Sequence, residues 1–227
     1  MQPATSSTDA LERVAPPWAL RGTGWMLLYR FDPQQALDSG WVPPHLTDDF
    51  RGGVGAVMLV DYTTSPVGPY RELLFIPGVS RRRRRRYHTI SKIYVSTQAS
   101  VVNGRENWGI PKQLADFEIN PVEPNKQRFS VSLNGQMFFS ALLEPGALRF
   151  PVNTLFNPFP VRLLQEHQDG RLRSVLPRAG GVISPTATLH ELAIDNDAFP
   201  DVTAYQPLGV IEVVQARLTF PLPLTVS

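Results

Sequence analysis

Proline and glycine interrupt this chain at short intervals, and their spacing limits what it can fold into. The 227 residues include 22 prolines and 16 glycines, with proline spread through the whole sequence and only short apolar runs in between. Proline removes a backbone donor and glycine raises the entropy cost of ordering, so both disfavour long helices. The pattern therefore favours short strands joined by turns.

Several runs between these interruptions have the composition of β-strands, because they alternate in polarity or are rich in β-branched and aromatic residues. They predict a mainly β (α+β) fold with a few short helices, in which mostly antiparallel strands close a barrel or form a sandwich. We expect residues 1–14 to be a flexible lead-in and residues 15–227 to form a single domain. The predicted strands are Gly24–Phe31, Gly55–Tyr62, Arg71–Ile76, Thr89–Thr97, Arg128–Leu133, Gln136–Leu143 and Val210–Phe220.

Two dipeptides predict tight hairpins between such runs. Asn134-Gly135 separates two predicted strands, and Asp169-Gly170 separates two shorter runs. Asn, Asp and Gly tolerate the positive φ angles that tight hairpin turns require. Both sites are therefore expected to join adjacent antiparallel strands.

Helices are expected at only two places. Asp32 followed by Pro33 predicts a helix start, because the Asp side chain can cap free N–H groups and proline at the first position gives up no needed donor. This helix should run to about Ser39. A second short helix is expected after Pro111.

Composition excludes several classes of site. The formal net charge is +2, so the chain is not globally basic. The absence of cysteine excludes a thiol nucleophile, a disulfide framework and a Cys-based zinc site. The four histidines lack metal-ligand spacing, so no metal site is expected. No apolar run approaches the roughly 20 residues that span a bilayer, and the N-terminus lacks a signal-peptide pattern, so we expect a cytoplasmic protein.

Six consecutive arginines, Arg81 to Arg86, form the most conspicuous charged segment. Clustered guanidinium groups can bind phosphate or nucleic acid. In a strand, however, alternate side chains face opposite sides, and only Tyr87 stands beside them as an aromatic platform. We therefore favour a solvated hairpin end just before a strand over a nucleic-acid site, with an oligomer contact as a third possibility.

Lys112 is the strongest candidate for chemistry. An isolated lysine is usually a solvated surface group, but Trp108, Ile110, Leu114 and Phe117 surround this one in sequence with apolar bulk. Apolar surroundings disfavour the ammonium form, and a neutral amine can attack a ketone whereas an ammonium cannot. Lys112 is therefore predicted to be a reactive amine.

The segment around Lys112 resembles a family signature. Gly104-Arg105-Glu106 followed by Gly109-Ile110-Pro111-Lys112 is similar to the Gly-Arg-Glu…Tyr-Pro-Lys-Lys motif of the acetoacetate decarboxylase family. In that family the first lysine after the proline forms a Schiff base with the substrate, and the family is a standard example of a lysine activated by desolvation or by a neighbouring cation. The resemblance implies the same role for Lys112.

The resemblance extends over most of the chain and implies further properties. Gly68-Pro69-Tyr70-Arg71-Glu72 resembles the segment that carries an active-site glutamate, and Glu72 falls on that position. Arg21, Tyr94 and Ile110 are then expected to contact the substrate. The family also implies an antiparallel barrel or cone-like sheet, a small keto acid as substrate, no metal or organic cofactor, and a homo-oligomer.

The chain also departs from the family pattern. Gln113 stands where the decarboxylases have a second lysine, and Val57 stands where counting places a second glutamate. Three functions therefore remain open: decarboxylation of acetoacetate or a related β-keto acid, a Schiff-base aldolase, dehydratase or hydratase reaction on a keto acid, and non-catalytic binding of a small molecule by an oligomer of the same fold.

Overall fold

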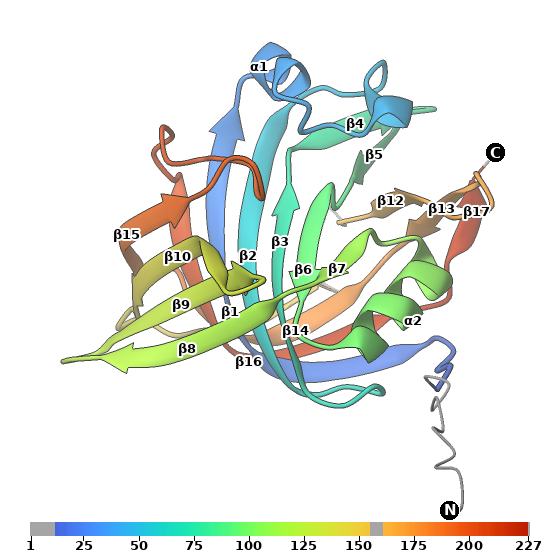
Figure 1. Cartoon of the computed structure of the whole chain (residues 1–227). Coiled ribbons are helices and arrows are strands. Elements are labelled where there is room, and N and C mark those ends of the chain that lie inside the picture. The colour runs from blue at the N-terminus through green and yellow to red at the C-terminus, as the bar shows by residue number, and fades with distance from the viewer. Residues whose placement is uncertain (1–11, 155–160, 227) are drawn as a thin grey trace, which may run out of the picture.

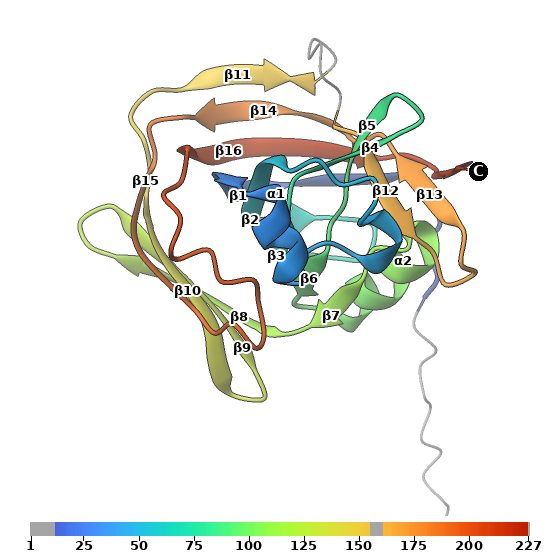
Figure 2. The same ribbon diagram turned by 90° about the horizontal axis from the view of Figure 1, so that it is seen from above.

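The computed structural model describes residues 12–154 and 161–226, and strands dominate this part of the chain. The predicted flexible lead-in therefore lies mostly outside the described residues. The largest sheet has eight strands, which follow one another from β11 at the top of Figure 2 downward to β7. Its strands, in spatial order, are β11 (Phe150–Asn153), β14 (Arg178–Ser184), β16 (Gly209–Phe220), β1 (Trp18–Phe31), β2 (Gly53–Thr64), β3 (Tyr70–Ile76), β6 (Lys92–Val95) and β7 (Lys112–Leu114).

Two smaller sheets pack around the large one. The four-stranded sheet lies on the left of Figure 1, whereas β12, β13 and β17 of the five-stranded sheet lie on the right beside α2 (Gln98–Trp108). The four-stranded sheet contains β15 (Thr188–Ile194), β10 (Gln136–Glu144), β9 (Lys126–Leu133) and β8 (Asp116–Val122). The five-stranded sheet contains β17 (Leu224–Val226), β13 (Leu172–Val175), β12 (Leu163–Glu166), β5 (Arg85–His88) and β4 (Val79–Arg82).

The predicted mainly β class with few helices is confirmed, but the predicted barrel is wrong. A barrel requires the two edge strands of a sheet to pair with each other. In the described residues, β11 pairs with β14 at one edge of the large sheet and β7 pairs with β6 at the other. Most pairs are antiparallel, and β6–β7 and β12–β5 are parallel.

The helices confirm one prediction and correct the other. Helix α1 (Pro33–Asp38) begins as expected, with the Asp32 side chain accepting a hydrogen bond from the Gln35 backbone N–H at 2.9 Å. The predicted helix after Pro111 is wrong, because the chain there enters β7; α2 instead precedes Pro111. A short 3-10 turn, η1, spans Pro44–Leu46. None of the described helices is long and apolar enough to cross a membrane.

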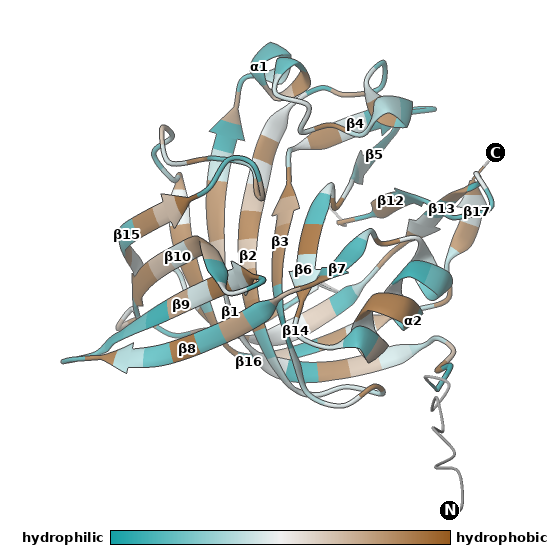
Figure 3. Ribbon diagram, viewed as in Figure 1, coloured by the Kyte–Doolittle hydropathy of each residue, from teal (hydrophilic) through white to brown (hydrophobic). Residues whose placement is uncertain are grey.

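Both predicted hairpins are confirmed. Asn134 and Gly135 have φ angles of 51° and 80° in the turn between β9 and β10, and Asp169-Gly170 lies between the antiparallel strands β12 and β13. The arginine run forms a third hairpin, β4–β5, with Arg83 and Arg84 at its tip. The structure thus confirms the hairpin end, and Figure 3 shows polar residues along this segment.

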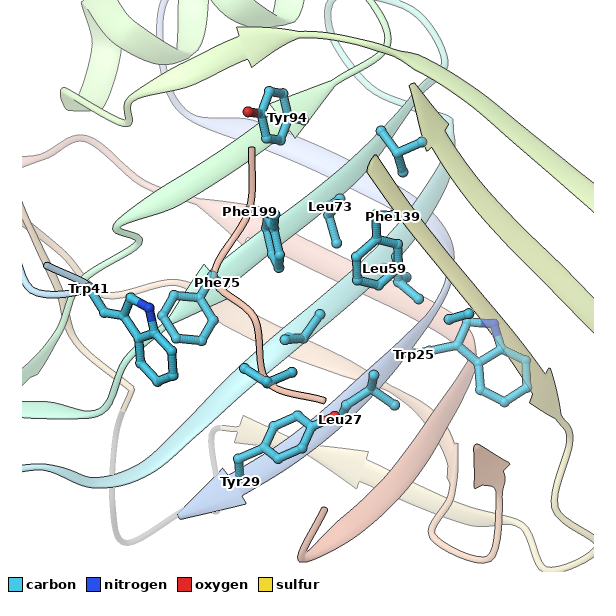
Figure 4. Packing of buried hydrophobic residues seen from close by; sticks show 14 of the residues in the cluster. Trp25, Leu27, Tyr29, Trp41, Leu59, Leu73, Phe75, Tyr94, Phe139 and Phe199 are labelled. Carbon is cyan, nitrogen blue, oxygen red and sulfur yellow. The ribbon is translucent and has the colours of Figure 1, made fainter. Parts of the chain in front are cut away.

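Alternate residues of the central strands face two different apolar clusters. We call one side of the large sheet the core face; it packs against β9 and β10, and Figure 4 shows part of this cluster. The opposite side, which we call the cavity face, contacts α2, β12 and β13. Core-face residues include Leu27, Tyr29, Val57, Leu59, Leu73, Phe75 and Tyr94. Cavity-face residues include Trp18, Leu20, Val60, Tyr62, Tyr70, Leu74 and Ile93.

Candidate active site

A cavity of about 360 Å³ lies on the cavity face of the large sheet. All eight strands of that sheet contribute to its lining, together with Trp108 of α2 and Leu163 of β12. The lining is almost entirely apolar, and among the described residues its only charged members are Glu72, Lys112 and Arg217. The described ranges contain no group of three or more His, Asp and Glu residues that could hold a metal ion.

Lys112 enters this cavity from the first position of β7. Its side chain is 5% exposed, and its Nζ donates hydrogen bonds to Glu72 Oε2 at 3.1 Å, Ser100 Oγ at 2.9 Å and Tyr70 Oη at 3.3 Å. An ammonium group has three donors, so each can be matched by one of these oxygens. The Nζ also lies 4.7 Å from the centre of the Tyr70 ring. The arrangement holds a single buried amine beside one carboxylate.

The signature segment positions Lys112 through the end of α2. Thr97 caps the start of the helix, and Gly109 ends it in the left-handed region with φ 71°. The turn then returns along the helix, so that the Arg105 Nε donates to the Lys112 carbonyl at 2.7 Å. In the sheet, Lys112 pairs with Ile93 of β6, and both lie on the cavity face. The backbone on either side of Lys112 is therefore fixed.

Gly104 gives the Lys112 side chain its path past the helix. A Cβ atom at this position would lie 2.6 Å from Cδ of Lys112 and 2.9 Å from Cε. Two non-bonded carbon atoms cannot lie this close together, so the lysine side chain or the helix would have to shift. The glycine of the signature thus sets the direction in which the amine extends, and any other residue would displace it.

Glu72 and Tyr70 reach the same point from β3. They are two residues apart on one strand, so their side chains share a face, and both are largely buried. Burial first, and the Glu72 carboxylate second, raise the pKa of Tyr70 well above its ordinary value. The same two causes raise the pKa of Tyr62, whose ring centre is 4.9 Å from that of Tyr70. Both phenols therefore stay protonated near neutral pH and are available as donors.

Of the residues predicted to form the site, the structure brings Lys112, Glu72 and Ile110 together and leaves two outside. Ile110 is 3% exposed and lines the cavity. Arg21 is exposed on β1, and strand alternation turns it away from the cavity that its neighbour Leu20 lines. Tyr94 belongs to the core face, where its hydroxyl donates to the Ala198 carbonyl at 2.9 Å.

The two departures from the family pattern also lie away from the cavity. Val57 is fully buried in the core face, so a carboxylate there would not reach Lys112. Gln113 is exposed and follows Lys112 on β7, where successive side chains point to opposite faces. A lysine at position 113 would therefore extend away from the Lys112 amine. In this structure neither departure changes the wall of the cavity.

Two polar neighbours of Lys112 were missed by sequence reasoning. Tyr70 was visible in principle, because it is two positions before Glu72 on a predicted strand and must share its face. Ser100 was not, because its position depends on α2, which was not predicted. Thr97 as an N-cap and Gly109 as a C-cap were the available signals for that helix.

Comparison with known proteins first identifies a family. Residues 2–173 match the family model described as acetoacetate decarboxylase. Two curated relatives match more locally: the protein NEOXANTHIN-DEFICIENT 1 of Arabidopsis thaliana is 27% identical over 116 residues, and that of Solanum lycopersicum is 26% identical over 104 residues. The matches cover 50% and 45% of this chain. They span only 40% and 35% of those relatives, so less than half of their length is represented here.

Solved structures with the same fold cover nearly the whole chain. Acetoacetate decarboxylase from Legionella pneumophila is 19% identical with a TM-score of 0.65, covering 98% of this chain and 93% of its own. The enduracididine biosynthesis enzyme MppR, complexed with pyruvate, is 17% identical with a TM-score of 0.66 (99% and 95%). An acetoacetate decarboxylase-like enzyme from Sphingomonas wittichii is 13% identical with a TM-score of 0.69 (99% and 98%). At these identities the likeness establishes the fold alone.

Proposed function

The chain belongs to the acetoacetate decarboxylase family, and from this premise we propose that it is a lyase that decarboxylates a β-keto acid through a Schiff base on Lys112. The observation that carries the proposal is the buried amine: Lys112 Nζ lies 3.1 Å from the Glu72 carboxylate inside an apolar cavity. Glu72 can take a proton from the ammonium within the pair, which leaves a neutral amine and a carboxylic acid. A neutral amine is the form that attacks a carbonyl.

The first stage joins Lys112 to the keto carbon. The amine nitrogen forms a bond to that carbon, and the carbonyl oxygen receives a proton to give a carbinolamine. Loss of the hydroxyl as water, after a second proton transfer, leaves a protonated imine. Glu72, Tyr70 and Ser100 lie within hydrogen-bond reach of Nζ, and Glu72 and Tyr70 are proposed to exchange these protons.

The second stage breaks the carbon–carbon bond. The electrons of the bond to the carboxylate move toward the iminium nitrogen, which releases CO2 and leaves an enamine. Protonation of the enamine carbon regenerates an iminium, and water then releases the ketone and the free amine. The overall reaction converts a β-keto acid anion and one proton into a ketone and CO2. Glu72, once protonated, is placed to return a proton to the enamine.

The apolar wall supports this stage. The substrate carboxylate is charged and the departing CO2 is not, so a poorly solvated site favours the products of bond breaking. Removing water from around the charged carboxylate is one named way in which an enclosed site can favour such a step. In this cavity the charged residues of the described lining are limited to Glu72, Lys112 and Arg217, so little polar surface surrounds the substrate.

Borohydride trapping tests the proposal. Incubation with acetoacetate and borohydride should give a covalent adduct on Lys112, and CO2 should be released without borohydride. Lys112→Ala should abolish both. Lys112→Arg should also be inactive, because guanidinium stays protonated. Lys126→Ala, a matched loss of a lysine in β9 outside the cavity lining, should retain both activities. An active Lys112→Ala variant would overturn the assignment.

An aldol, dehydration or hydration reaction is the second candidate, and the geometry around Nζ is compatible with it. Tyr70 and Glu72 supply two proton-transfer groups beside one imine, and the solved MppR structure of the same fold holds pyruvate. An adduct on Lys112 without CO2 release from any β-keto acid would favour this candidate. If no keto acid gives an adduct between pH 5 and 9, both enzymatic proposals fail and non-catalytic binding is favoured.

A further inference from the structure

The cavity is far larger and more apolar than acetoacetate requires. A volume of about 360 Å³ lies in the range of pockets that bury drug-sized ligands, and a small keto acid would leave most of it empty. We propose that the substrate is a β-keto acid with an extended, uncharged hydrocarbon tail. This inference rests on the proposed function, since the keto group must still reach Lys112.

The position of Lys112 gives the tail a direction. Lys112 is on β7, at one edge of the large sheet, whereas Val152, Ile183 and Val213 line the cavity from β11, β14 and β16 toward the other edge. Neighbouring strands lie about 4.8 Å apart, so a ligand bound at Lys112 faces a cavity that continues across several strands. An extended chain fits this shape, and a compact molecule does not fill it.

Small residues leave room on the part of the sheet away from β7. Ala216 of β16 and Ala179 of β14 both line the cavity. Both share a sheet face with Leu218, because Ala216 lies two residues before it on β16 and Ala179 pairs with it across the strands. Larger residues at these positions would fill the same volume, so the length of the space depends on them.

The chemistry of the lining specifies the tail. Apart from the Lys112–Glu72 pair, the one charged residue among the described lining residues is Arg217, which is exposed and pairs with Arg21 across β16 and β1. A second carboxylate carried into the cavity would lose its water without a buried cationic partner, which is costly. An apolar chain gains free energy from the same burial. The tail is therefore expected to be hydrocarbon.

A chain-length series tests this inference. Decarboxylation and the rate of borohydride-trapped adduct formation should be measured for acetoacetate, 3-oxohexanoate, 3-oxooctanoate and 3-oxodecanoate. We expect kcat/KM to rise about fourfold for each methylene that is buried. 3-Oxoadipate, which has the length of 3-oxohexanoate and a second carboxylate, should react at least about 100-fold more slowly than 3-oxohexanoate.

The outcomes separate this inference from the proposed function. An adduct with acetoacetate whose rate stays level or falls with chain length overturns the tail and leaves the Schiff base standing. Equal rates for 3-oxoadipate and 3-oxohexanoate also overturn it. Absence of any adduct, with acetoacetate included, overturns the proposed function itself and the inference with it.

Filling the cavity supplies a second test. Ala216→Leu should make the rise in kcat/KM stop at a shorter chain, and Ala179→Leu should do the same if the first variant folds poorly. Ala193→Leu is the matched control, because Ala193 is exposed on β15 and lies outside the cavity lining; it should keep the full length dependence. An unchanged length dependence in a folded Ala216→Leu or Ala179→Leu variant contradicts the inferred path of the tail.

Discussion

The two faces of the large sheet are built from alternate residues of the same strands, yet one is filled and the other is hollow. On β3, Leu73 and Phe75 enter the core face, where Phe139 and Phe199 from other elements pack among them (Figure 4). Their neighbour Leu74 instead lines the cavity that also contains Glu72. Both faces are buried and largely apolar, so hydrophobicity alone does not distinguish them.

The difference lies in what each face meets. The core face meets aromatic side chains of the four-stranded sheet and of the segment before β16, which pack against the residues of the sheet. The cavity face meets α2 and the five-stranded sheet across a gap, and the buried charged residues of the sheet lie on that side. A buried Lys–Glu pair is a costly feature to retain for packing, so its placement supports the proposal that the chemistry takes place on the hollow face.

Removing one charge of the buried pair should produce the largest effect. Glu72→Leu leaves the Lys112 amine without its carboxylate in an apolar cavity, so the free energy of unfolding should fall by about 3–5 kcal/mol. Urea denaturation measures this change. The double variant Glu72→Leu with Lys112→Met should recover most of the loss, because no lone buried charge remains.

The control for this prediction is an exposed pair. Arg128 and Glu191 are 2.8 Å apart with side chains that are 35% and 59% exposed, so Glu191→Leu should change stability by about 1 kcal/mol or less. If Glu72→Leu costs no more than Glu191→Leu, the cavity face does not hold a desolvated charge pair and the contrast between the faces fails.

Neighbouring leucines on β3 compare the packing of the two faces directly. Leu73 is fully buried in the core face, and Leu73→Ala should lower the free energy of unfolding by about 3 kcal/mol because it opens a new cavity among packed side chains. Leu74 already borders the cavity, so Leu74→Ala should cost about half as much. Urea denaturation of the two variants measures both. Equal losses would show that the cavity face is packed as tightly as the core face.

Local sequence signals predicted much of this architecture. The capping Asp32 and the turn Asn134-Gly135 act through neighbouring backbone groups, so the sequence around them is sufficient. Helix α2 was missed because the residues it buries include Ser100, Asn103 and Gly104, which show no apolar helical period. These residues serve contacts with Lys112 and with the chain before β1 instead of a hydrophobic core.

Sequence reasoning placed correctly the residues that lie in recognisable segments, and it misplaced those whose orientation depends on distant strands. Lys112 was predicted from its local apolar setting and Glu72 from the family resemblance of its segment, and the structure places them 3.1 Å apart. Arg21, Tyr94 and Val57 required knowledge of which face each strand turns toward the cavity, and a shift of one residue reverses that face. Closure of the sheet likewise depends on pairing between its edges, which local patterns do not specify.

A substitution that displaces the Lys112 amine but leaves the other cavity residues in place should have the next largest effect. Gly104→Ala places a methyl group 2.6 Å from Lys112 Cδ and should slow adduct formation about 100-fold, because a shift of about 1 Å in a reacting group costs this much. Stability should fall by about 1–2 kcal/mol, because the strain of overpacking against the buried Lys112 side chain exceeds the gain from alanine as the better helix former.

Trapping kinetics and urea denaturation measure the two consequences of Gly104→Ala separately. Val102→Ala is the control in the same helix, because Val102 lies outside the cavity lining, and adduct formation should stay near the unmodified rate. Normal trapping by Gly104→Ala would show that the glycine does not set the position of the amine.

A tyrosine on each face gives the smallest and most specific contrast. Tyr29 is buried in the core face, and its hydroxyl has no hydrogen-bond partner among the described residues. Tyr29→Phe should therefore raise stability by about 1 kcal/mol at neutral pH, because it removes an unsatisfied polar group. Tyr70→Phe should lower it by a similar amount, because Lys112 Nζ loses an acceptor. Urea denaturation at neutral pH measures both changes.

Alkaline pH should widen the effect at Tyr29. Burial raises the pKa of Tyr29 from 10.0 to about 12, so as pH rises from 10 toward 12 the unfolded chain releases this proton while the folded chain keeps it. The unmodified protein then loses stability, and the advantage of Tyr29→Phe should grow by about 2 kcal/mol over that interval. A constant advantage in urea denaturation at both ends would contradict the burial of this phenol. A widening advantage would show that the Tyr29 hydroxyl on the filled face is buried at a cost to stability, in contrast to the Tyr70 hydroxyl on the hollow face, which accepts a hydrogen bond from Lys112.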